Sequence, residues 1–297
     1  MNLKSDDLGE NMDRMITKEL LSQRLLPREN DTHKGDYGHA LLVCGCDRMP
    51  GAASLATGAA LKSGCGLVTL HSSSSACRIS SVMNPSAILS IDEGPCFCGS
   101  EFNWNKYNAV GVGPGLGKDP KSKIALEKLM ESCSAAGIPM VLDADALNLI
   151  AENGWIHRIP QDCILTPHDG ELSRLISNLG KEDKLRQTQL LADKTRSVVI
   201  AKGYHTKVFI PDEQSPYENT TGNPGMAKGG SGDVLSGIIL SMLGQGVEPF
   251  DAACCGAYIH RRAGDRCANE MGEFGMTPTD MLNAIPYILK PLNSREW

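Results

Sequence analysis

The sequence predicts an α/β fold in which a mainly parallel sheet is covered by helices on both faces. Short apolar runs of strand type alternate with helical segments along most of the 297 residues. Several of these runs are apolar throughout, which is typical of parallel strands that are buried on both faces. Hydrophobic residues make up 41% of the chain and charged residues 22%, which indicates a globular protein with a substantial core.

The expected elements follow one another in a regular order. The first strand lies at residues 39–45, and an alanine-rich helix follows at residues 50–64, with Pro50 near its start and Gly64 at its end. Further strands are expected at residues 66–71, 108–113, 138–144, 162–166, 197–203 and 206–211. Further helices are expected at residues 121–136, 145–152, 170–178 and 182–195, and mostly helical structure from residue 234 onward. The serine-rich residues 71–81 are read as a loop or a helix start.

We expect two parts in the chain, a loosely held N-terminal arm (residues 1–30) and a single domain (residues 31–297). The arm is polar and carries charges of both signs, so it does not have the apolar core of a secretory signal. No apolar run approaches the ~18 residues that a membrane span needs. These features predict a cytoplasmic protein that does not act on membranes.

Charge and cysteine content exclude two classes of protein. The net charge is −6 and no basic stretch stands out, which argues against a nucleic-acid binder. The eleven cysteines lack the spacing of a zinc ribbon, and several lie in apolar or glycine-rich runs. We interpret them as buried, reduced thiols in a reducing compartment and expect no protein metal ligands.

A glycine-rich stretch in the last third of the chain is the clearest candidate site. Residues 223–239 read NPGMAKGGSGDVLSGII, with four glycines before Asp233 and an apolar helix after it. Closely spaced glycines allow backbone N–H groups to form an anion-binding nest, and a helix N-terminus adds positive potential. Asp233 is either an N-cap or a general base beside bound phosphate. Because Ser231 or a glycine could cap without adding repulsion, we favour the base.

Lysine and glycine residues follow two other strands. Lys202 and Gly203 end the strand at residues 197–203, where a phosphate can be met at the carboxyl edge of the sheet. A solvent-facing lysine before a turn is the plainer alternative. The stretch GVGPGLGKD is no P-loop, because Asp119 follows Lys118. Its glycines form either an ordinary tight turn or a place where a ligand approaches the main chain.

Two further strand ends carry polar side chains. Asp143 ends a strand and Asp145 is expected to cap the next helix. Asn148, one turn later, is placed near the same space. His168 follows the strand at residues 162–166, and either Thr166 or Asp169 is expected to cap the helix beside it.

Taken in order, these segments resemble the ribokinase-like superfamily and, within it, the ADP- or ATP-dependent NAD(P)H-hydrate dehydratases. The resemblance covers residues 33–297 and rests on HKGDYGHALLVCG, MPGAASLATGAALKSGCGLV, GVGPGLG, VLDADALN, LTPHDGE, AKGYHT and NPGMAKGGSGD. It implies a three-layer α/β/α fold. It also implies a repair reaction that uses ADP or ATP to phosphorylate the added hydroxyl of hydrated NADH or NADPH (NADHX or NADPHX, in the S form). Phosphate then leaves, and NAD(P)H is regenerated with AMP or ADP.

The resemblance also implies roles for individual residues. Ala53, Gly115 and His168 would bind the hydrate, and Asp233 would face its hydroxyl as the catalytic base. The adenine nucleotide would be held by Lys202, Gly203, Tyr204, His205, Thr206 and Gly232. A magnesium ion would be bound mostly through phosphates and water. Two positions depart from the family pattern: Asp169 replaces an expected proline, and Lys228 would add a positive charge near the phosphates.

Several expectations concern partners and alternatives. The resemblance favours ADP over ATP as the donor and functional pairing with a separate epimerase. We also expect a homo-oligomer such as a tetramer, because the alanine-rich helix at residues 50–64 and the C-terminal helices could pack against a second copy. The first alternative function is a ribokinase-like kinase that phosphorylates a hydroxymethyl pyrimidine, a thiazole alcohol or a sugar. The second is a nucleotide sensor without turnover. A sensor would gain nothing from an acid at position 233.

Overall fold

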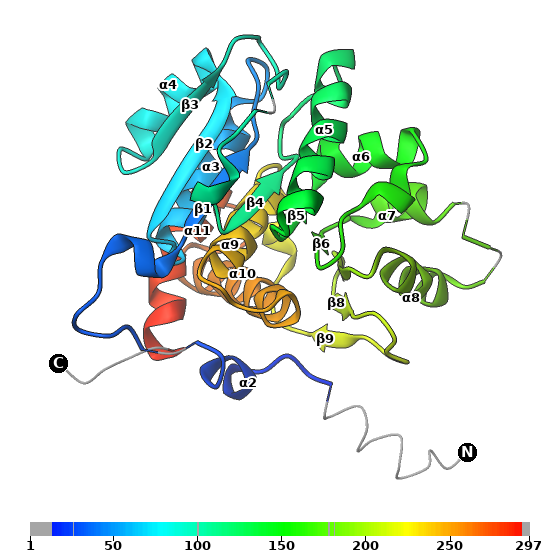
Figure 1. Cartoon of the computed structure of the whole chain (residues 1–297). Coiled ribbons are helices and arrows are strands. Elements are labelled where there is room, and N and C mark those ends of the chain that lie inside the picture. Colours follow the sequence, from blue (N-terminus) through cyan, green and yellow to red (C-terminus); the bar gives the residue numbers. More distant parts are fainter. Residues whose placement is uncertain (1–13, 26, 100, 178, 181, 293–297) are drawn as a thin grey trace.

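A central sheet organises the molecule, as the computed structural model shows (Figure 1). The structure describes residues 14–25, 27–99, 101–177, 179–180 and 182–292. Within them the sheet has nine strands in the order β3-β2-β1-β4-β5-β6-β7-β8-β9. The strands are β1 (His39–Val43), β2 (Leu67–Ser73), β3 (Ile88–Asp92), β4 (Ala109–Val112), β5 (Met140–Leu142), β6 (Ile164–Leu165), β7 (Val198–Ala201), β8 (Thr206–Phe209) and β9 (Tyr217–Asn219).

The strand order has a topological switch point between β1 and β4. The first seven strands in this order, from β3 at the edge to β7, are all parallel. In the sheet as described, the pairs β7–β8 and β8–β9 are antiparallel. Strand β1 pairs with β2 on one side and β4 on the other, so the connections leave in opposite directions from this point. In open parallel sheets, ligands bind outside the carboxyl ends of the strands at such a switch.

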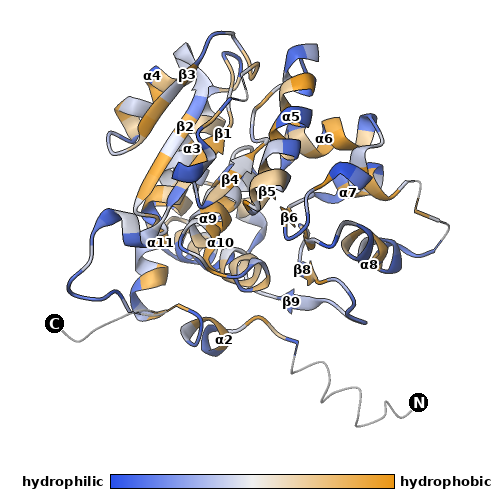
Figure 2. Ribbon diagram, viewed as in Figure 1, coloured by the Kyte–Doolittle hydropathy of each residue, from blue (hydrophilic) through white to orange (hydrophobic). Residues whose placement is uncertain are grey.

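Helices cover both faces of the sheet. One face packs against α3 (Pro50–Lys62), α4 (Ser74–Met83), α9 (Ser231–Gly244), α10 (Pro249–Met271) and α11 (Pro278–Leu289). The other face packs against α5 (Pro120–Ala136), α6 (Ala144–Glu152), α7 (Asp169–Ile176) and α8 (Lys184–Thr195). Alternate residues of β1 serve the two cores: Leu42 faces the first, and Leu41 and Val43 face the second. Figure 2 shows the central strands and α9 as predominantly hydrophobic.

Helices α3 and α9 approach each other closely, and this brings their N-termini together. A Cβ atom on Gly237 would lie 2.2 Å from the carbonyl oxygen of Ala56, so only glycine permits this distance. The alanine-rich sequence of α3 presents small side chains at the same contact. As a result, the start of α9, which carries Asp233, lies beside the start of α3 at the carboxyl edge of the sheet.

Most of the expected elements are confirmed, and two strands were missed. Strand β3 forms the free edge of the sheet, and most of its residues are exposed or only half-buried, so it lacks the signature of a buried run. Strand β9 has three residues and pairs only at the other edge. The serine-rich segment, for which a loop or a helix was expected, contains helix α4, capped by Ser73 through the N–H of Ala76.

The described part of the N-terminal arm is docked and not loosely held. Its short helix α2 (Lys18–Ser22) buries Leu21 completely, and Ile16 is 3% exposed. Both residues belong to the core on the α9 and α10 face. The N–H of Ile16 also donates to the carbonyl of Glu218 on β9. Two apolar side chains in a polar segment therefore anchor it; residues 1–13 lie outside the described residues.

Candidate active site

The carboxyl ends of β1, β4 and β5 form the floor of the candidate site. The N–H of Gly45, after β1, donates to the carbonyl of Pro114, after β4, at 2.7 Å. Gly113 has φ +129°, and a Cβ atom there would lie 1.8 Å from the carbonyl oxygen of Asp143. This close backbone contact positions Asp143 at the centre of the sheet edge.

Asp143 holds two other groups of the site. Its side chain is 2% exposed; Oδ1 lies 2.8 Å from Nζ of Lys202, and Oδ2 accepts a hydrogen bond of 2.7 Å from Ser236. Lys202 arrives from the end of β7 and Ser236 from α9. The ammonium group also reaches Gly232, since a Cβ atom on that glycine would lie 3.4 Å from Nζ. Lys202 and the glycine-rich loop, which are separate in the sequence, therefore lie next to each other here.

Asp233 is not the N-cap of α9. The N-cap is Gly230, with φ +98°, and Asp233 is the third residue of the helix. The pKa of the Asp233 carboxyl is raised from 3.8 to about 6, mainly by burial and in smaller part by Asp143 and Asp145, while Lys202 acts to lower it. A carboxylate with a raised pKa is a better proton acceptor near neutral pH than an ordinary aspartate. The structure thus disfavours the capping alternative.

The loop before Asp233 presents backbone amides. Among the described residues, no backbone carbonyl accepts from the N–H groups of Gly229, Gly230, Gly232 or Asp233. Such free N–H groups at a helix start are suited to bind an anion. The loop is supported from beneath by His260, whose Nε2 lies 2.9 Å from the carbonyl oxygen of Ser231. Burial lowers the pKa of His260 to about 3, so this support is neutral.

His168 lies at the start of α7 and caps that helix itself, in place of the expected Thr166 or Asp169. Its Nδ1 accepts from the N–H of Gly170 at 3.0 Å, and its Nε2 lies 3.2 Å from Oε1 of Glu171. Glu171 is buried, and burial raises its pKa. The two contacts fix the imidazole with Nδ1 as acceptor and Nε2–H as donor. About half of the His168 side chain remains exposed at the site.

Ala53 and Gly115 lie on neighbouring elements. Ala53 is fully buried on α3, next to Gly45, whose Cβ position is 2.7 Å from the methyl carbon of Ala53. Gly115 has φ +60°, and a Cβ there would lie 2.7 Å from Cβ of Ala52 and 3.0 Å from Cβ of Met49. Both residues thus lie next to the point where the strand order switches, and Gly115 offers only its backbone.

Residues 202–205 form a tight connection between β7 and β8, and Thr206 begins β8. Tyr204 is 78% exposed and stacks on His205 with ring centroids 4.6 Å apart. Nδ1 of His205 lies 2.8 Å from Oε1 of Glu218. Thr206 differs from these neighbours because it is buried and pairs with Asn219 in the sheet. The structure therefore brings Lys202, Gly232 and Asp233 together, with Tyr204 and His205 further along the same edge.

The remaining polar candidates have partners elsewhere. Lys228 donates to the carbonyls of Phe274 and Met276, so its ammonium group ties the loop to the segment after α10. Asp169 is the first residue of α7, where an acid is favourable, and it pairs with Lys184. Asp145 does not cap α6; it accepts from the N–H of Gly117 at 2.8 Å. Asn148 accepts hydrogen bonds from Arg174.

Side chains suited to hold a metal do not gather in the described residues. No group of three or more His, Cys, Asp or Glu side chains is placed there to bind an ion. Asp143 is already engaged by Lys202 and Ser236. All eleven cysteines lie within the described residues as free thiols, nine of them buried. In the same part of the chain, no helix has both the length and the hydropathy to cross a bilayer.

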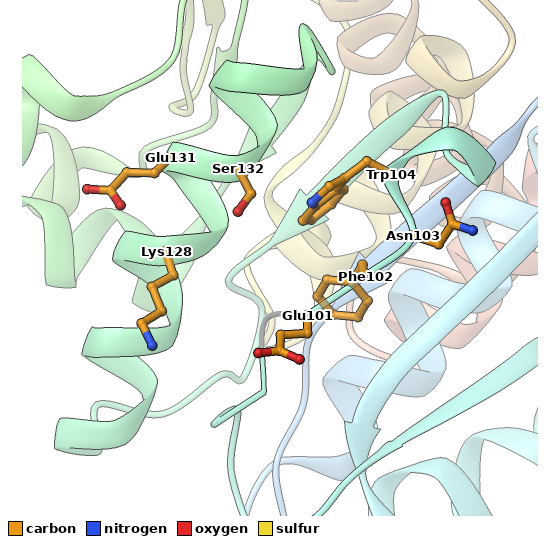
Figure 3. A pocket seen from close by; sticks show the side chains of 7 residues that line it. All are labelled: Glu101, Phe102, Asn103, Trp104, Lys128, Glu131 and Ser132. Carbon is orange, nitrogen blue, oxygen red and sulfur yellow. The ribbon is translucent and has the colours of Figure 1, made fainter.

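Two surface cavities among the described residues lie away from these groups. One, of about 550 Å³, is lined by α5 and by the segment that precedes β4, including Phe102 and Trp104 (Figure 3). The other, of about 1200 Å³, lies between the N-terminal segment and the C-terminal ends of α3 and α9. Neither is lined by any of the predicted site residues.

Three residues of the site escaped sequence reasoning. Ser236 lies one turn after Asp233 in an apolar helix, and Glu171 resembles an ordinary first-turn acid. Arg261, on α10, is nearly buried and donates to the carbonyls of Gly203 and Tyr204. No local signal singled it out, because α10 carries several other charged residues, including Arg262, Asp265 and Arg266.

Comparisons with known proteins show the family of the chain. A family model described as NAD(P)H-hydrate dehydratase matches residues 40–287. The bifunctional NAD(P)H-hydrate repair enzyme of Moorella thermoacetica is 36% identical over 94% of this chain and 54% of its own. The chain therefore spans about half the length of this relative and of the other bifunctional repair enzymes that it matches.

Shorter relatives and solved structures match along most of their length. An ADP-dependent (S)-NAD(P)H-hydrate dehydratase of Neisseria meningitidis is 35% identical over 80% of each chain. The structure of an ADP/ATP-dependent NAD(P)H-hydrate dehydratase from Bacillus subtilis, co-crystallized with ATP and Mg²⁺, superposes with a TM-score of 0.79. Its sequence is 29% identical, and the superposition covers 94% of this chain and 98% of that chain. Superposition on a ribokinase-like protein confirms the expected ribokinase-like, three-layer fold.

Proposed function

Because the chain belongs to the NAD(P)H-hydrate dehydratase family, we propose that it dehydrates the S form of NADHX or NADPHX with ADP as phosphoryl donor. The products would be NADH or NADPH, AMP and phosphate. The observation that carries the proposal is the position of Asp233. Its carboxyl has a pKa raised to about 6 and lies at the start of a helix whose first N–H groups have no backbone acceptor among the described residues.

Asp233 would act as the general base. It would take the proton from the added ring hydroxyl as that oxygen bonds to the terminal phosphorus of the nucleotide. Cleavage of the carbon–oxygen bond then releases phosphate, and loss of a proton from the neighbouring ring carbon restores the double bond. Ala53 and Gly115 would leave room for the ring at the switch point between β1 and β4, and His168 would contact the hydrate through its exposed edge.

The nucleotide would lie across the loop and the end of β7. The amide of Gly232 would bind phosphate oxygens, and Lys202 would add positive charge beside them. The group Lys202, Gly203, Tyr204, His205 and Thr206 would hold the nucleotide, with buried Thr206 acting through the backbone. Magnesium fits this donor set through phosphate and water only, because the described residues provide no cage for it. When bound, the ion would neutralise charge on the transferred phosphoryl group.

Three further proposals concern the setting of the reaction. The free thiols support a reducing compartment, and we propose the cytoplasm. The name of the longer relatives, bifunctional repair enzymes, supports a second activity that works with this one, and we propose an epimerase that supplies the S form. We also propose a homo-oligomer, such as a tetramer. Six large apolar side chains are exposed on β3 and α4 and could be covered by a second copy: Ile79, Val82, Met83, Ile88, Leu89 and Ile91.

Product analysis separates the dehydratase from a kinase of the same fold. The protein is incubated with Mg²⁺, ADP or ATP, and either the hydrate of NADH or an alcohol substrate such as a hydroxymethyl pyrimidine or a thiazole alcohol. The proposal expects free phosphate and NADH in equal amounts from the hydrate, and no reaction with the alcohols. A stable phosphorylated alcohol, with no phosphate released from the hydrate, would contradict it.

A further inference from the structure

A single nearly buried guanidinium connects two loops at the nucleotide side of the site. Arg261 lies on α10 and is 9% exposed. Its Nη1 donates to the carbonyl of Gly203 at 3.1 Å, and its Nη2 donates to the carbonyl of Tyr204. Its Nε donates to the carbonyl of Thr221, in the loop that leads to the glycine-rich stretch. One side chain therefore ties residues 203–204 to residues 221–223.

These contacts orient the peptide groups of the first loop. In a trans peptide the C=O and the following N–H point in opposite directions. Because the carbonyls of Gly203 and Tyr204 point toward Arg261, the N–H groups of Tyr204 and His205 point away from α10. Gly203 and Tyr204 are exposed. Within the part of the chain that the structure describes, no backbone carbonyl accepts from these two N–H groups. Two hydrogen-bond donors are thus presented outward.

The second loop is shaped to receive the same side chain. Gly222 has φ +100°, and a Cβ atom there would lie 2.3 Å from Nε of Arg261. Asp265, one turn further along α10, accepts from the N–H of Gly222 at 3.0 Å and from the side-chain amide of Asn223 at 3.1 Å. Helix α10 therefore holds this loop through an arginine and an aspartate. An arginine suits the arrangement, because its planar fork serves several carbonyls in fixed directions and a lysine does not.

We propose that Arg261 is a positioning residue for the adenine nucleotide: it fixes residues 203–205 so that the amides of Tyr204 and His205 can donate to that ligand. The inference rests on the proposed function, in which this segment binds the nucleotide. Arg261 does not touch the ligand in this account. It acts through the backbone of Gly203 and Tyr204, so its loss weakens nucleotide binding and leaves the chemistry at Asp233 intact.

The test compares ADP binding, measured by calorimetry without the hydrate, in the wild type and in Arg261→Met, Arg261→Lys and Arg266→Met. Arg266 is a matched control, because it lies on the same helix and, in the part of the chain that the structure describes, its guanidinium pairs with Glu270 and lies over the ring of Tyr287. Arg261→Met should raise the Kd and KM for ADP at least about tenfold, since hydrogen bonds from a charged donor are lost. The kcat at saturating ADP and the KM for the hydrate should stay within about twofold of wild type. Arg261→Lys should lie between, and Arg266→Met should match the wild type.

Two results would overturn the proposal. One is an ADP affinity of Arg261→Met within about twofold of wild type in a folded protein; the other is an equal loss in Arg266→Met. If Arg261→Met is not recovered folded, Arg261→Lys decides by the same criterion. A wild-type protein that binds ADP but does not convert the hydrate would contradict the dehydratase proposal. The ADP titrations of the variants would still test the role of Arg261, so the two proposals can be told apart.

Discussion

Nζ of Lys202 lies 2.8 Å from Oδ1 of Asp143, and both residues lie next to Asp233. The two members of this pair act on Asp233 in opposite directions, because Asp143 raises its pKa and Lys202 lowers it. The pair also holds a cation beside the glycine-rich loop, where we propose that phosphate binds. Burial is the main cause of the raised pKa of Asp233, and the contact between the ends of β5 and β7 adjusts it.

The pH dependence of the reaction should reveal this coupling. The base must be deprotonated, so kcat/KM should fall as the pH drops through about 6, the raised pKa of Asp233. Asp143→Asn removes the neighbouring negative charge and frees Lys202, so the acid limb should move to lower pH. Asp145→Asn should move it less, because Asp145 has the smaller effect on Asp233. An acid limb that is the same in all three proteins would show that Asp233 is not the titrating base.

Stability should respond to Asp233 in the opposite sense to activity. Its folded-state pKa is raised from 3.8 to about 6, so the folded protein prefers the protonated form and the charged form destabilises it above pH 6. Asp233→Asn should abolish turnover yet raise the free energy of unfolding at pH 8 by on the order of 2–3 kcal/mol. This gain should shrink below pH 6 and vanish near pH 4.

Thermal unfolding at pH 8 and pH 4.5 provides the measurement, with Asp169→Asn as the control. The pKa of Asp169 is lowered by Lys184, so its loss should bring no gain in stability at pH 8. If Asp233→Asn has the same Tm as the wild type at pH 8, the carboxylate is not held in an unfavourable environment.

Two glycines of one loop should differ in their tolerance to alanine. Gly115 and Gly117 have φ +60° and +79°, so alanine adds about 1–2 kcal/mol of backbone strain at either position. At Gly115 the new methyl group would also press on Ala52 and Met49, which adds typically 1–3 kcal/mol of overpacking. At Gly117 the nearest atom is 4.0 Å away.

Urea unfolding should therefore show the larger loss for Gly115→Ala, together with a raised KM for the hydrate. Gly117→Ala should keep the KM of the wild type. Equal losses of stability and an unchanged KM in both variants would remove Gly115 from the proposed substrate site.

The exposed apolar surface of β3 and α4 should control association. Ile91→Lys places a charge on the free edge strand, which opposes pairing with a second copy. Light scattering should show a smaller assembly for this variant than for the wild type. Phe274→Lys is the matched control, because Phe274 is fully exposed but lies outside that surface. A wild-type protein that is monomeric at working concentration would contradict the proposed homo-oligomer.

Local patterns in the sequence were sufficient to predict the parallel core of the fold. Strand β1 and helices α3 and α5 were placed within a few residues, because apolar runs and the prolines and glycines at their ends are local signals. Strand β3 was not, since most of its side chains are exposed or only half-buried and the run therefore does not resemble a buried strand. The docking of Leu21 depends on a surface formed by distant helices, which no local pattern reveals.

The residues of the candidate site also differ in how far local sequence patterns predicted them. Asp233 and the glycines before it were recognisable because the loop and the helix start are contiguous. The pairing of Asp143 with Lys202 joins residues 59 positions apart and follows only from the strand order. The role of Arg261 was even harder to predict, because its partners are backbone carbonyls, which every residue type has. His168 capping its own helix was missed because histidine is not among the preferred N-caps.

The most direct test follows reduced nicotinamide absorbance after hydrated NADH is mixed with the protein, Mg²⁺ and ADP. The proposed function predicts a rise that requires the nucleotide, is larger with ADP than with ATP, and is absent for Asp233→Asn, which should still bind ADP. A flat trace with both nucleotides, from a wild-type protein shown to bind them, would contradict the dehydratase and direct attention to the alcohol substrates of ribokinase-like kinases.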